Sequence, residues 1–463
     1  MWLQFDQGCR RIFFRCEQDV YRQGELLMSV GGSRNNKHNT KFTRSIPIMQ
    51  TLAKSALGVA VAAAVAATSV QASESLTMDP SLTFTYKNYY FDENNKGAGA
   101  TSGHDWSHAL IADFDTGYVN GLVGAVVTAG YAGPLDVDSG FATNVAGGSD
   151  DNQDDAISGF QQAYLKAQHS FSGVDFEGTV GVKKRSTETY SDSGSRILAA
   201  SSTGYDLSVG FEGVNAYFTE ITGVSERDAS TLSGDFYGNG VKLDYLRIVG
   251  ASYSYEGLDL AAEYGNSKDY AKQTFLKAGY GFELDDMSSV ELDVRYGRVK
   301  SDQPFNDAKA KYYNLNATYN YDNAYVAFGY NNTKDGDYNS DYFDGEHDKF
   351  NSSLSLWEDY AEEGEKAYVL SAGYNFADQG FSGLTWDVWY GKGTDAKQIN
   401  DFKRNEYGSY VNYAFDGALE GLSVAWFYTN YRARGDVQDN STLGGLSDLD
   451  INRLYLTYSV AAF

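Results

Sequence analysis

Most of the chain after residue 80 alternates between apolar and polar side chains with a period of two residues. In the segment 384–392, one face would hold Leu384, Trp386, Val388 and Tyr390. The segments 276–284, 290–296 and 368–376 can be divided into two faces in the same way. Strict alternation puts one kind of side chain on each face of an extended strand. The pattern therefore predicts a protein built from β-strands.

The candidate strands are separated by clusters of Gly, Asn and Asp. Four short links, FSGVDF, FEGVNAY, YEGLDL and FDGALEGLSV, indicate tight turns, whereas longer acidic stretches indicate loops. Pro80 is expected before the first strand, and Pro134 and Pro304 in loops, because proline deletes a ladder hydrogen bond. About 19 candidate strands can be found, but a closed barrel of this kind needs an even number. We therefore expect 18 strands, with 16 as the alternative.

The strands of soluble β-sandwiches also alternate between apolar and polar residues. The composition of the two faces therefore has to distinguish a sandwich from a membrane barrel. The apolar faces often end in Tyr, Phe or Trp, as expected for aromatic girdles at the two interfaces of a bilayer. The opposite faces are polar and rich in Gly, which a water-filled lumen permits. The mean hydropathy of −0.44 agrees, because only alternate residues of a barrel strand face lipid. The sequence predicts an all-β fold, a transmembrane antiparallel β-barrel.

One long apolar run, SALGVAVAAAVAATSV at 55–70, differs from the rest of the chain. It follows Lys54 and ends at Val70-Gln71-Ala72, which is the order of basic, apolar and small-residue regions in a secretory signal. We expect 49–72 to be a cleaved signal peptide and 73–463 to be the outer-membrane β-barrel. Residues 1–48 are expected to be an upstream extension outside the mature protein. Both cysteines lie in that extension, so no disulfide is expected in the barrel.

The chain is acidic, with 62 Asp and Glu residues against 37 Lys and Arg residues and a net charge of −25. Nucleic acid and anionic membrane surfaces are therefore poor partner candidates. The 15% aromatic content argues against a disordered chain. We expect small polar solutes as partners, no nucleic acid and no cofactor.

The last segment, INRLYLTYSVAAF, alternates outward-facing Leu454, Leu456 and Tyr458 and finishes at Phe463. A final strand with a terminal aromatic residue resembles the signal that the outer-membrane barrel-assembly machinery reads. Together with the signal peptide, it predicts localisation in the Gram-negative outer membrane. The expected partners there are outer-membrane lipid, lipopolysaccharide and the assembly machinery, and both a monomer and a homotrimer remain open.

Several segments resemble, in the same order, those of the OprD-type outer-membrane porins. They are SLTFTYKNYYFDEN, WSHALIADFDTGYVNGLVGAVVTAG, LDVDSG, SRILAASS, LTWDVWYGKGTD, LEGLSVAWFYTNYRARGD and LDINRLYLTYS. No single motif is specific, but the ordered series from the first strand to the last is. The resemblance implies an 18-stranded barrel, monomeric or loosely trimeric. Members of that family pass basic amino acids, small carboxylates, peptides or, in some cases, chitooligosaccharides.

Typical members line the lumen with a ladder of arginines that guides carboxylates, and several rungs are missing here. Ala425 and Phe427 stand on either side of Trp426, where the family commonly has arginine. Trp389 and Phe141 occupy two further positions of this kind. These departures weaken the expectation of carboxylate uptake. Three arginines remain at inward-facing positions: Arg295, Arg404 and Arg453.

If Trp426 faces lipid, alternation turns Phe427 and Tyr431 into the lumen. Aromatic rings next to hydroxyls and carboxylates suit sugars, and Asp387 and Glu406 would attract amino groups. We therefore predict neutral or cationic solutes, either oligosaccharides and amino sugars or basic amino acids and peptides. The alternative is that these rings only fill space beneath an inward-folded loop. The predicted pore-lining residues are Arg295, Asp387, Trp389, Arg404, Glu406, Phe427, Tyr431, Arg453 and Tyr455.

The stretch 133–157 is the predicted inward-folded constriction loop, because acidic residues at a narrow point would favour cations. An ordinary solvated surface loop is the alternative. Its predicted constriction residues are Asp136, Asp138, Ser139, Asp154 and Asp155.

A second acidic stretch, DGDYNSDYFDGE at 335–346, has the spacing of a calcium loop. Ser340 stands where that motif requires Gly, and no flanking helices are expected. No metal site is therefore assigned. The weak calcium-loop candidates are Asp335, Asp337, Asn339, Asp341 and Glu346.

An enzymatic barrel is the main alternative from another class, and a structural barrel with a plugged lumen is the second. After residue 72 the chain has four histidines but no Gly-x-Ser-x-Gly, phosphate-loop or metal-ligand spacing. His104 and His108 near Asp105 form only a weak constellation. We therefore expect a porin rather than an enzyme.

Overall fold

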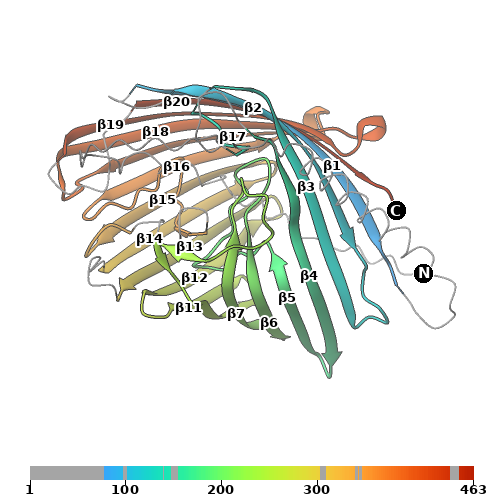
Figure 1. The fold of residues 1–463 in the computed structure, drawn as a ribbon. Coiled ribbons are helices and arrows are strands. Elements are labelled where there is room, and N and C mark those ends of the chain that lie inside the picture. Colours follow the sequence, from blue (N-terminus) through green and yellow to red (C-terminus); the bar gives the residue numbers. More distant parts are fainter. Residues whose placement is uncertain are drawn as a thin grey trace, which may run out of the picture.

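The computed structural model describes residues 78–96, 102–138, 140–146, 155–302, 309–338, 343, 347–437 and 448–463. Antiparallel strands dominate the fold (Figure 1). The barrel strands are β1 (Ser81–Asn95), β2 (Gly103–Asp115), β3 (Val123–Val137), β4 (Ile157–Phe171), β5 (Val174–Lys183), β6 (Ser201–Phe211), β7 (Val214–Ser225), β10 (Leu246–Tyr255), β11 (Leu258–Ser267), β12 (Ala271–Asp285), β13 (Ser288–Ser301), β14 (Lys309–Tyr321), β15 (Ala324–Lys334), β16 (Lys366–Asn375), β17 (Leu384–Thr394), β18 (Ile399–Ala414), β19 (Leu422–Val437) and β20 (Asp448–Ala461). A small hairpin of β8 (Tyr237–Gly238) and β9 (Val241–Lys242) lies between β7 and β10.

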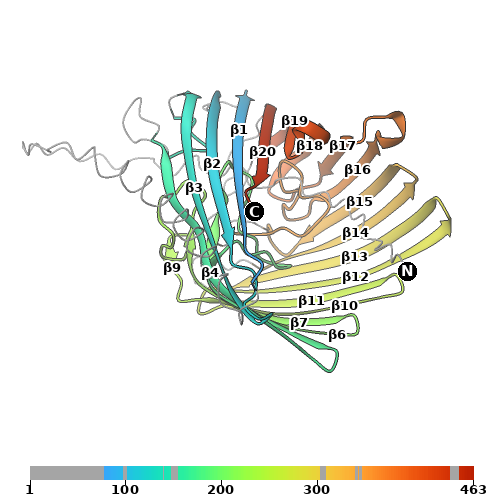
Figure 2. The same ribbon diagram turned by 90° about the vertical axis from the view of Figure 1, so that its right-hand side faces the viewer.

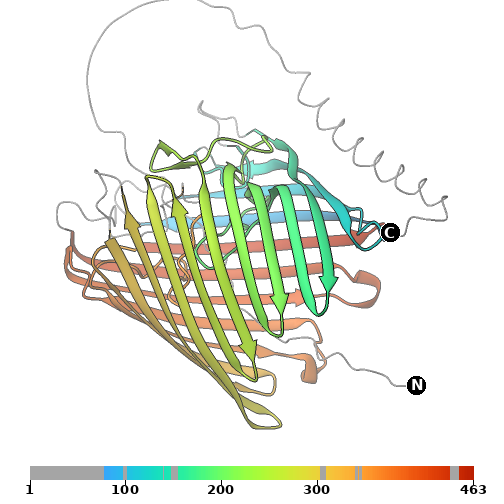
Figure 3. The same ribbon diagram turned by 90° about the horizontal axis from the view of Figure 1, so that it is seen from below.

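The sheet contains 18 strands and closes on itself, which confirms the expected strand number. Each barrel strand pairs with its neighbour in the chain, and β7 pairs with β10 across the small hairpin. β1 closes the ring by pairing with β20, where Tyr89 lies opposite Tyr455 and Phe91 opposite Arg453. Figures 2 and 3 show the ring of strands from two further directions. Closure leaves no open sheet edge, as a barrel in lipid requires.

Side chains alternate between the two faces of the wall as the sequence predicts. Leu370, Trp386 and Tyr390 are 53%, 46% and 43% exposed on the outer face. Trp426 and Leu454 are also outward, at 39% and 48% exposure. A belt of exposed apolar side chains of this extent is stable only against lipid. The intervening residues of the same strands therefore face the lumen.

Three of the four predicted tight turns have two central residues with positive φ. These residues are 172–173, 212–213 and 256–257, with φ values of 51° and 79°, 44° and 82°, and 46° and 84°. Both values are positive as in a type I′ turn, whose twist matches that of the flanking strands. The fourth link is longer and contains the 3-10 helix η2 (Gly417–Leu419), and η1 (Ala377–Gln379) joins β16 to β17. Among the described residues, no helix is long and apolar enough to span a membrane.

Pro134 lies inside β3, so its predicted position in a loop is wrong. It pairs with Ser107 of β2, and the register shifts there by one residue, between Trp106 and Ser107. This bulge tolerates a residue without an N–H group. The connection after β3 therefore begins at Asp138. Pro80 precedes β1 as expected, whereas Pro304 and the segments 1–48 and 49–72 lie outside the described residues.

Candidate functional site

Cations on part of the inward-facing wall are matched by adjacent carboxylates. The four pairs span β2 to β13, and their side chains are between 13% and 35% exposed. Opposite charges on neighbouring positions of a sheet stabilise one another. Asp206 is shared, because Arg185 also lies 3.1 Å from it. This part of the wall is therefore strongly polar, with most of its positive charge compensated. The pairs are Lys166–Asp115 at 2.6 Å, Lys183–Asp206 at 3.3 Å, Lys277–Asp259 at 2.5 Å and Arg295–Asp293 at 2.7 Å.

The connection between β15 and β16, which we call the β15–β16 loop, folds against the inward face of the barrel over residues 347–365 (Figure 2). The backbone N–H groups of Trp357 and Glu358 donate to Glu406 of β18 at 3.0 and 3.4 Å. The indole Nε1 of Trp389 donates to the same carboxylate at 2.9 Å. Glu406 is fully buried, so these hydrogen bonds replace the water that its charge would otherwise require. They attach the loop to the wall.

Arg404 makes a second attachment of this loop. Its guanidinium pairs with Glu365 at 2.6 Å, and both side chains are fully buried. The same group donates to the carbonyl oxygen of Asp359 at 2.7 Å and lies 4.2 Å from the ring centre of Tyr360. The planar guanidinium thus bonds a carboxylate, a backbone carbonyl and an aromatic face at once. Removing either charge would leave the other one buried and uncompensated.

Arg453 of β20 makes a third attachment, where the barrel closes. It pairs with Glu93 of β1 at 2.8 Å, and both side chains are buried. Its guanidinium lies 4.0 Å from the ring centre of Phe91 and 4.6 Å from that of Trp357. One side chain therefore links β20, β1 and the β15–β16 loop. Such contacts between a desolvated cation and aromatic rings are favourable.

The connection between β5 and β6, the β5–β6 loop, also lies against the inner wall over residues 184–200. Glu263 of β11 accepts the backbone N–H groups of Glu188 and Thr189 at 2.9 and 2.7 Å. The hydroxyl of Thr187 donates to it at 3.0 Å. Glu263 is only 3% exposed. A buried carboxylate with several donors is a strong point of attachment.

The two loops are joined to each other. His347 Nδ1 lies 2.8 Å from Asp192 Oδ1 and 3.1 Å from the hydroxyl of Tyr190. The side-chain amide of Asn351 donates to the Glu188 carboxylate at 2.5 Å. The β5–β6 and β15–β16 loops therefore form one connected layer across the lumen. This layer is the candidate functional site, because it lies across the path through the barrel.

All nine predicted pore-lining residues face inward, and they divide into two groups by exposure. Arg295 is partly exposed and donates to Asn351 of the β15–β16 loop at 3.0 Å. Asp387 and Tyr455 are also partly exposed. The other six are at most 9% exposed and lie beneath the loop layer, so they support it rather than face open water. These six are Trp389, Arg404, Glu406, Phe427, Tyr431 and Arg453.

Residues 141–146 of the predicted constriction loop do pack against the inner wall, where Val145 belongs to a buried cluster with Phe91. The buried carboxylate of Asp105 accepts the backbone N–H groups of Thr143 and Asn144 at 2.7 and 2.8 Å.

The predicted acidic residues that the structure describes do not face this contact of residues 141–146. Asp136 and Asp138 pair with His104 at 3.2 and 2.8 Å and are exposed. Asp155 is exposed, and Ser139 and Asp154 lie outside the described residues. The β5–β6 and β15–β16 loops also cover the inner wall, and Phe236 and Leu243 of the connection between β7 and β10 pack there as well. A count of acidic residues misses them, because apolar side chains such as Ile197, Leu354 and Trp357 hold loops against a wall.

Two of the calcium-loop candidates belong to the described residues, and both bind other groups of the protein. Asp335 pairs with Lys311 at 2.6 Å, and Asp337 accepts the backbone N–H of Glu363 at 2.6 Å. In the described part of the chain, no group of three or more acidic, His or Cys side chains could hold a metal ion. The remaining candidates, Asn339, Asp341 and Glu346, lie outside the described residues.

Sequence reasoning missed the acidic partners that hold the loops. Glu93 and Glu263 stand two positions from the inward residues Phe91 and Ala261. An acid next to an apolar residue on one face of a strand needs a partner when it is buried, and that is a signal that could have identified them. Glu365 carries no comparable signal, since it follows four other acidic residues in 358–363.

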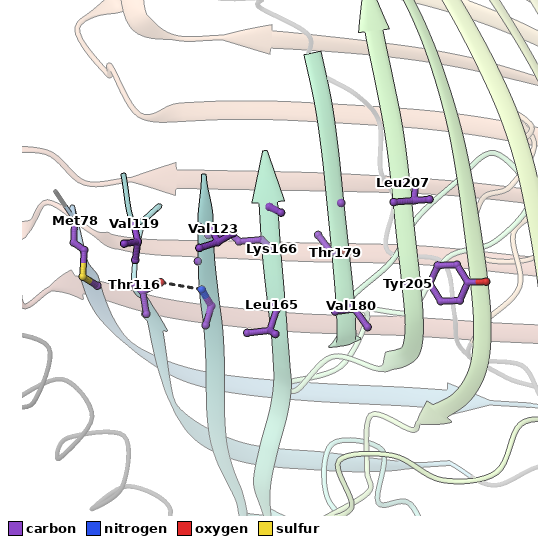
Figure 4. Close-up of a pocket in the computed structure, with 14 residues that line it drawn as sticks. Met78, Thr116, Val119, Val123, Leu165, Lys166, Thr179, Val180, Tyr205 and Leu207 are labelled. Carbon is purple, nitrogen blue, oxygen red and sulfur yellow. Dashed lines mark hydrogen bonds between the residues drawn. The ribbon is translucent and has the colours of Figure 1, made fainter. Parts of the chain in front are cut away.

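A hollow of about 650 Å³ lies at the short-turn end of β3 to β6, partly outside the barrel (Figure 4). Leu165, Val180 and Leu207 contribute to its lining and are 60%, 53% and 56% exposed on the outer face. The backbone N–H of Ala125 donates to the Thr116 hydroxyl at 2.8 Å beside it. Its apolar lining suits lipid and not a polar solute, so it is separate from the lumen site.

Comparisons with known proteins agree with this architecture. The sequence model described as outer membrane porin, OprD family, matches residues 76–462. Porin D of Pseudomonas aeruginosa is 26% identical over 361 residues, which cover 73% of this chain and 78% of that protein.

Solved structures with the same fold include OccK9 (OpdG) of P. aeruginosa, with a TM-score of 0.73 and 18% identity over 83% of this chain and 98% of that one. OpdK of P. aeruginosa, whose structure was determined with vanillate, has a TM-score of 0.70 at 17% identity, covering 83% and 99%. A BenF-like porin from Pseudomonas fluorescens Pf-5 has a TM-score of 0.70 at 21% identity, with the same coverage.

Proposed function

Because the chain belongs to the OprD family of outer membrane porins, we propose that it admits neutral and cationic small polar solutes in preference to anions. As a member of a porin family it is a channel rather than an enzyme. The observation that carries the preference is the pairing of the four wall cations with carboxylates. A compensated cation attracts a solute carboxylate less than a free one does. Passive diffusion needs no cofactor.

Within this class, basic amino acids and small peptides fit better than oligosaccharides. The rings that could stack on a sugar, Trp389, Phe427 and Tyr431, are 4%, 9% and 2% exposed. By contrast, the carboxylate of Asp387 is partly exposed on the inner wall, where it accepts the Tyr325 hydroxyl at 2.8 Å. That carboxylate would attract an amino group in the lumen.

The proposal includes export by a cleaved signal peptide at 49–72 and insertion by the barrel-assembly machinery. Both a monomer and a homotrimer are compatible with it. Lipid and lipopolysaccharide are the expected surroundings of the outer face.

We expect the purified barrel in a planar bilayer to prefer potassium over chloride in a salt gradient. The double variant Asp115→Asn and Asp259→Asn should shift the reversal potential toward chloride, because it leaves Lys166 and Lys277 without their carboxylates. Asp136→Asn combined with Asp138→Asn removes the same charge outside the lumen and serves as the matched control.

Titration of the open channel with lysine, benzoate and chitooligosaccharides tests the solute class. Block by lysine at lower concentration than by benzoate or sugar is the expected result. An anion-selective channel blocked first by benzoate would contradict the proposal and favour a carboxylate route, for which the vanillate in the OpdK structure is a precedent.

A further inference from the structure

A group of basic side chains lies on the outer face of β12 to β15, at the end where the β13–β14 and β15–β16 connections are attached. The strand register places Lys272 opposite Lys300, and Arg298 opposite Lys311. It also places Lys300 opposite Lys309, and Lys311 opposite Lys334. We call this group the rim patch, and its residues are Lys272, Arg298, Lys300, Lys309, Lys311 and Lys334.

The rim patch faces away from the lumen. Tyr313 and Leu315 share the face of Lys311 on β14 and are 43% and 49% exposed. The side chains of Lys272 and Lys300 are 43% and 47% exposed. These cations therefore lie on the outer surface, where a ligand outside the barrel can reach them.

Carboxylates of the described residues offset only part of this charge. Asp302 pairs with Lys272 at 2.5 Å and lies 3.8 Å from Lys300. Asp335 pairs with Lys311 at 2.6 Å. The hydrogen bond from Lys311 lowers the pKa of Asp335, and nearby positive charges, including Lys334, lower it further.

Asp269 of the β11–β12 turn attracts Lys272 electrostatically. Together with Asp302 and Asp335, three carboxylates therefore lie near the six cations. Like charges directly opposite each other in a sheet are destabilising. Carboxylates of the described residues can therefore offset only about half of the positive charge of the patch, although the whole chain carries a net charge of −25.

The position of the patch indicates what could supply the missing anions. Tyr296 and Tyr313 lie opposite each other with ring centres 5.4 Å apart, and they are the next outward residues after Arg298 and Lys311. Outward tyrosines of this kind mark the interface between hydrocarbon and headgroups. The rim patch therefore lies at headgroup height. Below it, the outer face continues with exposed apolar residues, namely Leu292, Leu315 and Phe328.

We propose that the rim patch binds the phosphate groups of an outer-leaflet glycolipid whose acyl chains lie along the apolar outer face of β13 to β15. Lysine and arginine form strong, charge-assisted hydrogen bonds to phosphate oxygens. Headgroup phosphates would relieve the repulsion between opposed cations. The adjoining apolar wall distinguishes a lipid from a soluble anion, because it offers the acyl chains a surface at the same place.

Native mass spectrometry of the detergent-solubilised barrel, titrated with a purified bisphosphorylated lipid A, tests this site. The triple variant Lys300→Gln, Lys309→Gln and Lys334→Gln should lose about fivefold in affinity for each neutralised lysine. The matched control is Lys268→Gln, Lys366→Gln and Arg434→Gln. Its three cations lie on the same rim, but each is paired with a carboxylate, at 3.1, 3.3 and 2.5 Å.

The expected result is strong loss in the rim-patch variant, little loss in the control, and weak binding of dephosphorylated lipid A to the wild type. Equal losses in the two triple variants would overturn the proposal, because they would indicate diffuse charge attraction. Inorganic phosphate that competes as well as the lipid would also overturn it. Unchanged single-channel conductance in the rim-patch variant would show that the barrel is folded and that any effect is separate from solute passage.

Discussion

Replacing Arg404 by methionine is expected to detach the β15–β16 loop from the barrel wall and to raise the single-channel conductance. The substitution leaves Glu365 buried without the guanidinium that lies 2.6 Å from it. It also removes the donor to the Asp359 carbonyl and the stacking on Tyr360. Breaking a buried pair from one side costs about 3–5 kcal/mol, which is large compared with the stability of a single loop. The loop should therefore leave the wall for part of the time.

Conductance traces and limited proteolysis of the folded protein would measure this effect, since a detached loop becomes a protease substrate. The double variant Arg404→Met and Glu365→Gln provides the control, because it removes both charges and leaves no buried ion. It should recover much of the wild-type conductance. If the single and double variants conduct alike, the ion pair does not hold the loop in the way described.

Replacing Glu263 by alanine is expected to have a comparable effect on the β5–β6 loop. Two backbone N–H groups, those of Glu188 and Thr189, lose their acceptor, as does the Thr187 hydroxyl. Each unsatisfied buried donor costs about 1–3 kcal/mol. Because Glu188 is also bonded to Asn351, release of this loop should loosen the β15–β16 loop as well. We expect larger and noisier conductance.

Current noise and mean conductance in a bilayer would record that change. Glu220→Ala is the matched control, since Glu220 of β7, two strands away from Glu263, pairs with Arg247 on the outer face. It should leave the channel current unaltered. Wild-type conductance and noise in Glu263→Ala would contradict the anchoring role assigned to this carboxylate.

The sequence predicted well which side chains of the barrel wall face lipid and which face the lumen, because successive side chains of a strand point to opposite faces. The outward position of Trp426 was enough to turn Phe427 inward, and the structure agrees. Short links such as Ser172-Gly173 could be predicted as turns from the sequence, because few residue types tolerate a positive φ at two successive positions. These properties are local, so neighbouring residues contain the information.

The loop layer could not be predicted in the same way. Glu406 and Trp357 are 49 positions apart in the chain, and Glu263 and Thr189 are 74 apart. The sequence of one segment does not identify its hydrogen-bond partner in the other, because the folded barrel decides which distant segments lie next to each other. For the same reason, Trp389 and Phe427 were correctly placed inward, but their burial beneath a loop was left as one of two alternatives.

The distribution of charge shows most clearly the difference between what the sequence predicts and what the tertiary structure decides. The net charge of −25 argued against anionic partners, yet the register of β12 to β15 gathers six cations on one outer surface. By itself, the sequence determined the strands, their number, the lipid-facing residues and the resemblance to a porin family, because periodicity and order along the chain encode them. Only the tertiary structure decided which loops line the channel, which charges are paired and where the cations meet, because these depend on distances between residues remote in sequence.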